Sequence, residues 1–175
     1  RAVDRMEIRI DSPDPFKQVG EILTKGMNVM DGYYNNPEAS NTVLSPDGWL
    51  HTGDLGVLDP DGYLYIKGRS KSLILGPSGQ NIYPEEIEDL LNAQPYIAES
   101  LVIEREGKLV ALVYPDAEAM KQNKISREAL LKIIHETRKQ INQQIPAYSQ
   151  IARIEIHDEE FEKTPKRSIK RFLYQ

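Results

Sequence analysis

The sequence has no cysteine among its 175 residues, so it can form no disulfide bond and offers no thiolate ligand to a metal ion. A reducing compartment is compatible with this composition. The three histidines, His51, His135 and His157, lie far apart, and none shows the i, i+4 spacing of a helical metal site. We therefore assign no metal ligand in this chain.

Long apolar runs and an excess of positive charge are absent as well. No apolar stretch approaches the roughly 20 residues of a membrane-spanning helix, and the first residues lack the character of a signal peptide. The formal net charge is −5, whereas a surface that binds nucleic acid is basic, so we expect no nucleic-acid partner. With 39% hydrophobic and 28% charged residues, the composition is typical of a soluble globular protein.

The first part of the chain is predicted to be rich in strands. It opens without an initiator Met and leads at once into residues 6–10, where apolar and charged side chains alternate as in a strand with one buried face. We therefore interpret the chain as a fragment of a longer protein. Residues 20–26, bounded by glycines, form a second predicted strand that pairs with the first in a hairpin or small barrel. Asn36 followed by Pro37 marks the start of a helix.

Further elements follow from turn residues and apolar spacing. Residues 55–59 and 63–67 flank Pro60-Asp61-Gly62, a turn sequence, and are predicted to form a hairpin. The remaining predictions are strands over residues 98–104, 108–114 and 152–156, and a long helix from its cap Ser126 to Pro146 with one apolar face formed by Leu130, Ile133, Ile134, Thr137, Ile141 and Ile145.

A central stretch, residues 68–89, combines features that are unusual together. A basic run leads into an apolar segment and then a turn with Gly76 and Gly79 on either side of Pro77 and Ser78. Pro84 then begins an acidic helix, since proline suits a first helical turn and carboxylates suit the positive end of the helix dipole. An ordinary strand, turn and helix is the alternative interpretation.

Two motifs carry a family resemblance. Residues 48–56 read GWLHTGDLG and, after the predicted hairpin, residues 68–88 read GRSKSLILGPSGQNIYPEEIE. In this order and at this separation they resemble the adenylate-forming superfamily of acyl-CoA synthetases, luciferases and peptide-synthetase adenylation domains. The resemblance covers nearly the whole chain and implies an α+β fold. Residues 1–68 would be the distal, strand-rich part of the large AMP-binding domain, residues 69–71 a hinge, and residues 72–175 a mobile C-terminal α+β domain with an antiparallel sheet packed with helices.

The resemblance also implies roles for individual residues. Asp54 would hold the ribose hydroxyls of ATP or AMP, because a carboxylate can accept two hydrogen bonds from a vicinal diol. Arg69 would contact the ribose from the hinge side, and Lys71 lies where the C-terminal domain swivels. A turn-forming aspartate and an arginine in a surface ion pair are the alternatives.

For thioester formation, the matching loop is residues 76–81, with Ser78 and Gly79 as the candidate contacts to coenzyme A. Gly79 would let the main chain lie along the pantetheine arm, and a simple turn glycine is the alternative. The loop is not a phosphate loop, because the Lys-Ser/Thr pair of that motif is absent.

The strongly basic tail, residues 161–175, departs from the family pattern. Family members end with Gly-Lys-Ile-x-Arg, whose lysine acts in adenylation, but alignment on Ile169 and Arg171 places Ser168 at that lysine position. In an extended segment Lys166 and Lys170 would point to the same side as Ser168, so these two lysines are the candidate catalytic cations. The tail resembles long-chain fatty acyl-CoA synthetases most, and a basic, solvated surface segment is the alternative.

The resemblance therefore predicts part of an AMP-forming ligase that converts ATP, a fatty acid or other carboxylic acid, and coenzyme A to acyl-CoA, AMP and diphosphate. ATP and Mg²⁺ are implied by the family, the magnesium site lies outside this chain, and the fragment alone should be inactive. Alternatives are a carrier-protein or amino-acid-activating enzyme and a non-catalytic interaction module. The rest of its own large domain is the expected partner, and the cytoplasm the expected location, with peripheral contact at the inner face of a membrane left open.

Overall fold

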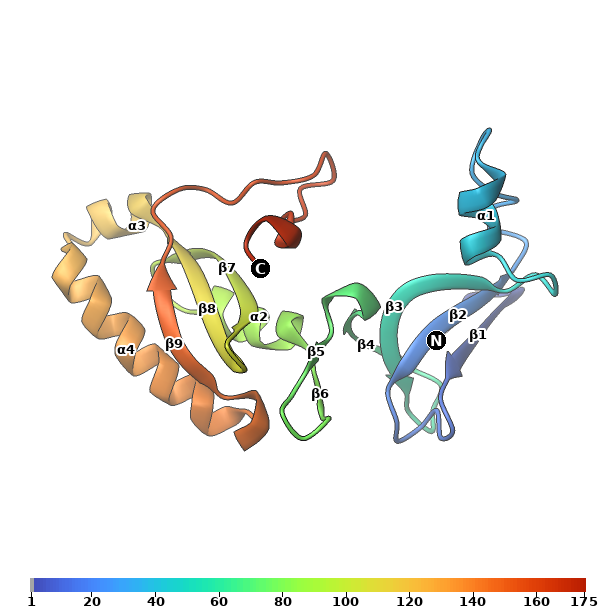
Figure 1. The fold of residues 1–175 in the computed structure, drawn as a ribbon, viewed down its shortest axis with the longest axis horizontal. Helices are drawn as coiled ribbons and strands as arrows, with labels where there is room; N and C mark the ends of the chain where they lie inside the picture. Colours follow the sequence, from blue (N-terminus) through green and yellow to red (C-terminus); the bar gives the residue numbers. More distant parts are fainter. Residues whose placement is uncertain (1) are drawn as a thin grey trace. The chain divides into compact units, whose positions relative to one another are not determined.

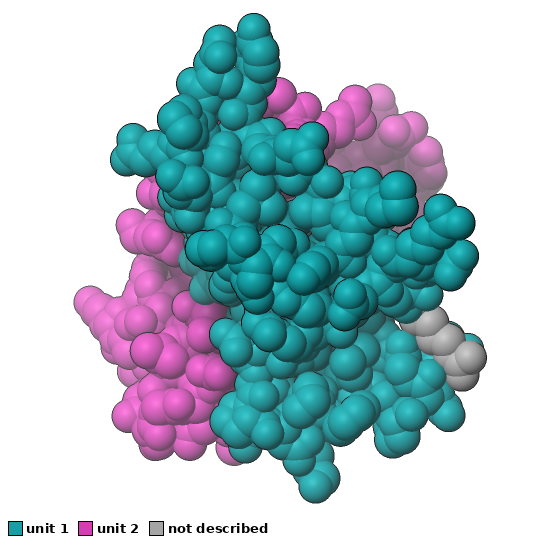
Figure 2. Space-filling view, turned by 90° about the vertical axis from the view of Figure 1, so that its right-hand side faces the viewer, with its two compact units in different colours: residues 1–72 teal, residues 73–175 magenta. Residues whose placement is uncertain are grey.

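The structure is a computed structural model that describes residues 2–175, and Figure 1 shows its ribbon. The chain divides into two compact units, Arg1–Ser72 and Leu73–Gln175, which are coloured separately in Figure 2. The division falls one residue after Lys71, the position predicted as the hinge. The assignment of the units to a large domain and a mobile domain, with a hinge between them, stays a prediction.

The first unit is built on a four-stranded antiparallel meander in the order β1-β2-β3-β4. Its strands are β1 (Met6–Asp11), β2 (Gly20–Gly26), β3 (Leu50–Leu58) and β4 (Leu64–Arg69), so the first two predicted strands and the predicted hairpin are confirmed. The helix α1 (Pro37–Val43) begins as expected, because the side chain of Asn36 accepts a hydrogen bond from the N–H of Ala39 at 3.0 Å. A 3₁₀ turn, η1 (Ser70–Ser72), closes the unit.

The second unit is an α+β domain, which confirms the predicted fold class. A small hairpin, β5 (Ile74–Leu75) and β6 (Asn81–Ile82), precedes the helix α2 (Pro84–Asn92). A three-stranded sheet in the order β7-β8-β9 follows. Its elements are β7 (Ile97–Arg105), β8 (Lys108–Pro115), α3 (Ala117–Gln122), α4 (Arg127–Gln144), η2 (Ala147–Ser149) and β9 (Ile151–Ile156), and η3 (Arg171–Leu173) lies in the tail.

The strand directions add one feature that the sequence patterns did not indicate. β7 and β8 form the expected antiparallel hairpin, whereas β9 joins β8 in parallel. The reason is the connection, because α3 and α4 carry the chain back along the sheet before β9 begins, and parallel neighbours require such a crossover. The helix α3 was not predicted either, although Asp116 caps it by accepting from the N–H of Ala119 at 2.9 Å.

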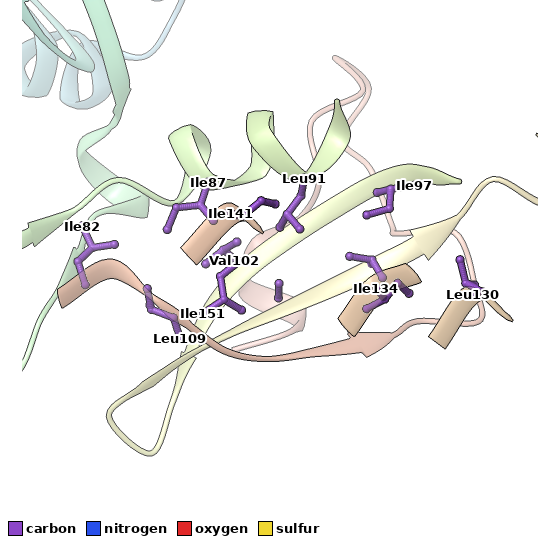
Figure 3. Close-up of a cluster of buried hydrophobic side chains, with 12 residues drawn as sticks. Ile82, Ile87, Leu91, Ile97, Val102, Leu109, Leu130, Ile134, Ile141 and Ile151 are labelled. Atoms are coloured by element: carbon purple, nitrogen blue, oxygen red, sulfur yellow. The ribbon is translucent and has the colours of Figure 1, made fainter. Parts of the chain in front are cut away.

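One face of this sheet carries the main core, drawn in Figure 3. The helix α4 contributes Leu130, Ile134 and Ile141 from its predicted apolar face, and α2 contributes Ile87 and Leu91. The sheet contributes alternate residues, as the two-residue period of a strand requires. These residues are Ile97, Val102, Leu109, Ala111, Val113 and Ile151, and Ile97 lies on the same face as Val102 because β7 has an irregularity between Ile97 and Glu99.

The C-terminal tail covers the opposite face of the sheet. Leu101, Ile103, Val110 and Leu112 form a second buried cluster there with Phe161, which is only 2% exposed. Tyr174 packs edge-on against Phe161, with ring centroids 5.2 Å apart. Although the tail is basic, it is therefore a packed layer of the domain.

A buried ion pair fastens the end of the tail to the sheet. The guanidinium of Arg171 donates to both carboxylate oxygens of Glu88 on α2, at 2.8 and 2.9 Å, and to the carbonyl oxygen of Val102 on β7 at 2.8 Å. Glu88 in turn accepts from the N–H of Val102 at 2.6 Å. Burial raises the pKa of the Glu88 carboxyl above its ordinary value, while the charge of Arg171 and the N–H of Val102 act in the opposite direction. The sequence had suggested only a helix-dipole role for this glutamate.

Loss of this pair should destabilise the second unit. In Arg171→Ala, Glu88 stays buried without its counter-charge, which costs about 3–5 kcal/mol in the free energy of unfolding. Urea unfolding of the 175-residue chain, followed by circular dichroism, measures the loss. Arg167→Ala, which removes an exposed arginine four residues away, is the matched control and should change stability little.

The loss should also depend on pH with a defined sign. A carboxyl whose pKa is raised by folding holds its proton more tightly in the folded state, so its contribution to stability decreases as pH rises from below the ordinary glutamate pKa to the raised value. Arg171→Ala raises that pKa further, so the deficit should be larger at neutral pH than below about pH 4.3, the ordinary value. An equal deficit at both pH values would contradict a charged Glu88 as its cause.

Candidate functional site

The two residues predicted to bind the nucleotide ribose lie together at the β3–β4 hairpin. Asp54 and Arg69 are directly opposite each other in the register of the two strands. Arg69 Nε and Asp54 Oδ1 are 3.1 Å apart, and the side chains are 62% and 33% exposed. The carboxylate is therefore open to solvent, and since it can accept about four hydrogen bonds, it keeps capacity for a ligand beside the arginine.

Asp54 stands in an irregular part of β3 that the sequence analysis did not resolve. Thr52 Oγ donates to the carbonyl of Ile22 at 2.7 Å and accepts from the N–H of Asp54 at 3.1 Å. The carboxylate of Glu21 accepts from the N–H of Gly53 at 3.0 Å and contacts Nδ1 of His51 at 2.9 Å. Thr52 belongs to the motif at residues 48–56. Glu21 lies 32 residues before Gly53, and no sequence pattern had indicated it as a site residue.

Lys71, the predicted hinge residue, lies in the middle of η1 and is exposed. No structural feature of the first unit assigns it a binding role. Its function as a pivot stays a prediction.

The predicted coenzyme A contacts lie in the turn between β5 and β6. The N–H of Gly76 donates to the carbonyl of Gln80 at 2.8 Å, and the N–H of Gly79 donates to the carbonyl of Gly76 at 2.9 Å. Gly79 has a φ of +80°, which a residue with a Cβ rarely adopts, so the turn itself requires this glycine. Ser78 lines a cavity of ≈ 400 Å³ with Leu75, Leu109 and Tyr148, whereas Gly79 lies outside the lining.

The tail forms a hairpin, which corrects the expectation of an extended segment. Lys163 pairs with Ile169, the N–H of Thr164 donates to the carbonyl of Ser168, and the N–H of Arg167 donates to the carbonyl of Thr164. Lys166 therefore sits in the turn, where the two-residue alternation of a strand no longer applies. Arg167 has a φ of +62°, the conformation that favours glycine, at the position where the family pattern has Gly.

The two candidate cations differ in their surroundings. Lys170 makes two contacts with Glu162. Its side-chain Nζ lies 3.1 Å from Oε2 of the glutamate, and its main-chain N–H donates to the main-chain carbonyl of the glutamate at 2.8 Å. Lys166 and Ser168 are exposed near the tip of the hairpin. An exposed ion pair such as Lys170–Glu162 contributes little free energy, so it can be exchanged for a stronger anion.

The structure groups the predicted residues within each unit. Asp54 and Arg69 form one group in the first unit, while the β5–β6 turn and the tail hairpin carry the others in the second unit. Among residues 2–175, no three His, Asp or Glu side chains are placed to hold a metal ion. In the same part of the chain, no helix combines the length and apolar character needed to cross a membrane.

Comparison with known proteins agrees with this architecture. Residues 71–174 match the family described as AMP-binding enzyme C-terminal domain. Indoleacetate–CoA ligase from Aromatoleum aromaticum is 50% identical over 98 residues, which cover 54% of this chain and 19% of that protein. 2-Succinylbenzoate–CoA ligase from Bacillus cereus is 41% identical over 122 residues, which cover 70% of this chain and 24% of the relative.

A solved structure covers both units. o-Succinylbenzoate CoA synthetase from Bacillus subtilis, in complex with its acyl-adenylate intermediate, aligns with a TM-score of 0.76 and 30% identity over 99% of this chain and 34% of that chain. The chain thus spans a fifth to a quarter of the curated relatives it matches and a third of this solved chain. On the match over residues 71–174, this protein belongs to the AMP-binding enzyme C-terminal domain family.

Proposed function

We propose that the chain is the C-terminal part of an AMP-forming acid–CoA ligase. ATP activates a carboxylate to an acyl-adenylate, and the thiol of coenzyme A then displaces AMP. The observation that carries the proposal is the pairing of Asp54 with Arg69, because it sets a partly exposed carboxylate and a guanidinium side by side at the motif of the nucleotide-binding family. The two relatives named above are CoA ligases, which supports the same reaction class.

In the nucleotide site, Asp54 accepts hydrogen bonds from the two ribose hydroxyls. The two hydroxyl groups are neutral, so no charged group of the ribose has to leave water. Each hydrogen bond is strengthened by the charge of the acceptor. Arg69 holds the carboxylate in place through its 3.1 Å contact and offers its remaining N–H groups to the ribose.

In the adenylation step, the tail hairpin supplies positive charge. An anionic carboxylate attacks an anionic α-phosphate, so a cation placed there lowers the energy of the transition state. Lys170 takes this role in our proposal, with Lys166 as the alternative, because Ser168 carries no charge. The phosphate oxygens then replace Glu162 as the partner of Lys170.

For the second step, the turn from Gly76 to Gln80 lies against coenzyme A. Ser78 offers a hydroxyl, and Gly79 presents main chain without a side chain, with no atom within 4 Å of the position that a Cβ would take. The cavity beside this turn is large enough for part of a cofactor. Mg²⁺ accompanies ATP in the family, but residues 2–175 contain no fitting ligand set, so no step here passes through it.

The identity of the carboxylic acid substrate is a further part of the proposal. The tail sequence favours a long-chain fatty acid, whereas the relatives are named for indoleacetate, sulfoacetate and 2-succinylbenzoate. A carrier-protein thiol is the alternative acceptor. Thioester formation by the complete enzyme with palmitate, indoleacetate and 2-succinylbenzoate, each with coenzyme A and with a carrier protein, distinguishes these possibilities. We propose a cytoplasmic location for the enzyme.

Asp54→Ala should weaken ATP binding in the complete enzyme and leave the fold intact. Two charge-assisted hydrogen bonds contribute roughly 1.5–3 kcal/mol each, so the dissociation constant should rise at least about a hundredfold. Isothermal titration calorimetry measures it. Asp61→Ala, which removes an exposed turn carboxylate from the same unit, should bind ATP as the parent does. Parent-like affinity in Asp54→Ala would refute the ribose contact.

Lys71→Pro should impair thioester formation more than adenylation. Proline fixes φ near about −65°, so it restricts the dihedral change that a swivel requires. The two half-reactions are measured separately in the complete enzyme, by pyrophosphate exchange and by thioester formation from added acyl-adenylate. Equal loss of both would count against a pivot at this residue.

Lys170→Ala should reduce adenylation by about a hundred- to a thousandfold, the usual loss when one electrostatic stabiliser is removed. Thioester formation from pre-made acyl-adenylate should be spared. Lys166→Ala tests the alternative cation, and Lys132→Ala, an exposed lysine on α4, is the control. Parent rates of adenylation in both tail variants would exclude the tail lysines as the source of charge.

A further inference from the structure

We propose that Glu21 is a positioning residue whose carboxylate shapes the segment that presents Asp54 to the nucleotide. The inference rests on the proposed function, since it assigns Glu21 a purpose through Asp54. β2 and β3 meet at a partly buried irregularity, and Glu21 lies outside both of the sequence motifs that carry the family resemblance.

The irregularity is a bulge in β3. Glu21 pairs with Leu55, and Leu23 pairs with His51, so that residues 52–54 of β3 stand opposite the single residue Ile22 of β2. A bulge bends its strand and changes the direction of the side chains it carries. Asp54 is the last residue of this bulge, so its direction depends on the shape of residues 52–54.

The backbone of the bulge needs partners that the β2 ladder does not provide. A polar backbone group left unpaired in a partly buried place costs free energy. Here side chains supply the partners, because Glu21 Oε1 accepts from the N–H of Gly53 at 3.0 Å and Thr52 Oγ accepts from the N–H of Asp54 at 3.1 Å. Gly53 has a φ of +72°, so the glutamate holds the residue that makes the sharpest departure from strand geometry.

Both oxygens of this glutamate are engaged within the protein. The second oxygen, Oε2, lies 2.9 Å from Nδ1 of His51, and the glutamate side chain is 26% exposed. A carboxylate committed to two internal partners, near a site for an anionic nucleotide, has no favourable contact to make with phosphate. Glu21 therefore acts on the nucleotide through Gly53 and Asp54.

The test separates the reach of the side chain from its charge. In the complete enzyme, Glu21→Gln keeps the length and an acceptor oxygen for Gly53 but loses the charge, whereas Glu21→Asp keeps the charge and is one methylene too short. We expect Glu21→Gln to bind ATP within about threefold of the parent, and Glu21→Asp and Glu21→Ala to bind about tenfold more weakly, as for the loss of one hydrogen bond to a charged group. Glu7→Ala, an exposed glutamate on β1 of the same sheet, is the control.

A double-mutant cycle with Asp54→Ala decides whether the effect passes through Asp54. Residues that act through one another give non-additive changes, so Glu21→Asp should alter ATP affinity little in the Asp54→Ala background. Equal losses in both backgrounds would overturn the inference, because they would indicate general destabilisation. Parent-like binding by Glu21→Asp, or weak binding by Glu21→Gln with tight binding by Glu21→Asp, would overturn it as well.

The design also keeps this inference apart from the function on which it rests. Should Asp54→Ala bind ATP normally, the ribose contact itself is refuted. A weakened Asp54→Ala with a normal Glu21→Asp refutes only the positioning by Glu21. Thermal unfolding of each variant identifies one that fails to fold, and if Glu21→Ala does so, the Gln and Asp variants still decide the outcome.

Discussion

Glu88 places a carboxylate inside the second unit, where burial makes its charged form costly and raises its pKa. Arg171 offsets that cost by donating to both carboxylate oxygens, and its third contact, to the carbonyl of Val102, ties the same guanidinium to the sheet. One ion pair thus joins a helix, a central hairpin and the tail. Lys170, at the end of the tail hairpin, directly precedes Arg171. The position of this proposed cation therefore depends on the ion pair between Arg171 and Glu88.

In the function that we propose, the two units have different tasks, and these follow from their different construction. The first unit is a meander whose bulge carries Asp54, the proposed acceptor for the ribose hydroxyl groups. In the second unit, packed side chains cover both faces of the sheet, and Lys166 and Lys170 lie on a short hairpin at the surface. Ribose recognition needs a fixed geometry, which a hydrogen-bonded bulge provides. Charge stabilisation tolerates a looser geometry, since Coulomb energy falls slowly with distance, and a hairpin end suffices for it.

The sequence predicted the regular parts of the fold because their signals are local. Alternation identified the strands at Met6–Asp11 and Ile151–Ile156, and the Ser126 cap with an apolar stripe identified α4. What escaped prediction depends on contacts between distant residues. The parallel direction of β9 is set by the crossover before it, and Glu88 looks like an ordinary helical glutamate until Arg171, 83 residues later, is placed against it.

The candidate site shows the same boundary between local and distant signals. Motif order was enough to bring Asp54 and Arg69 together, and the structure pairs them. Glu21 could not be found in that way, because its link to Gly53 spans 32 residues and runs from a side chain to the backbone. The turn at Lys166 was also missed, because this chain has Arg167, and not the glycine of the family pattern, at the residue with a φ of +62°.

The tail that covers the second face of the sheet has a consequence for how this domain is made on the ribosome. β7 and β8 leave the exit tunnel some fifty residues before the tail, and they carry Leu101, Ile103, Val110 and Leu112 on a face that nothing earlier in the second unit covers. That apolar face stays exposed until Phe161 and Tyr174 emerge. The buried Glu88 lacks its counter-charge until Arg171 emerges. A nascent chain stalled before residue 161 therefore presents an apolar sheet face that only later residues cover.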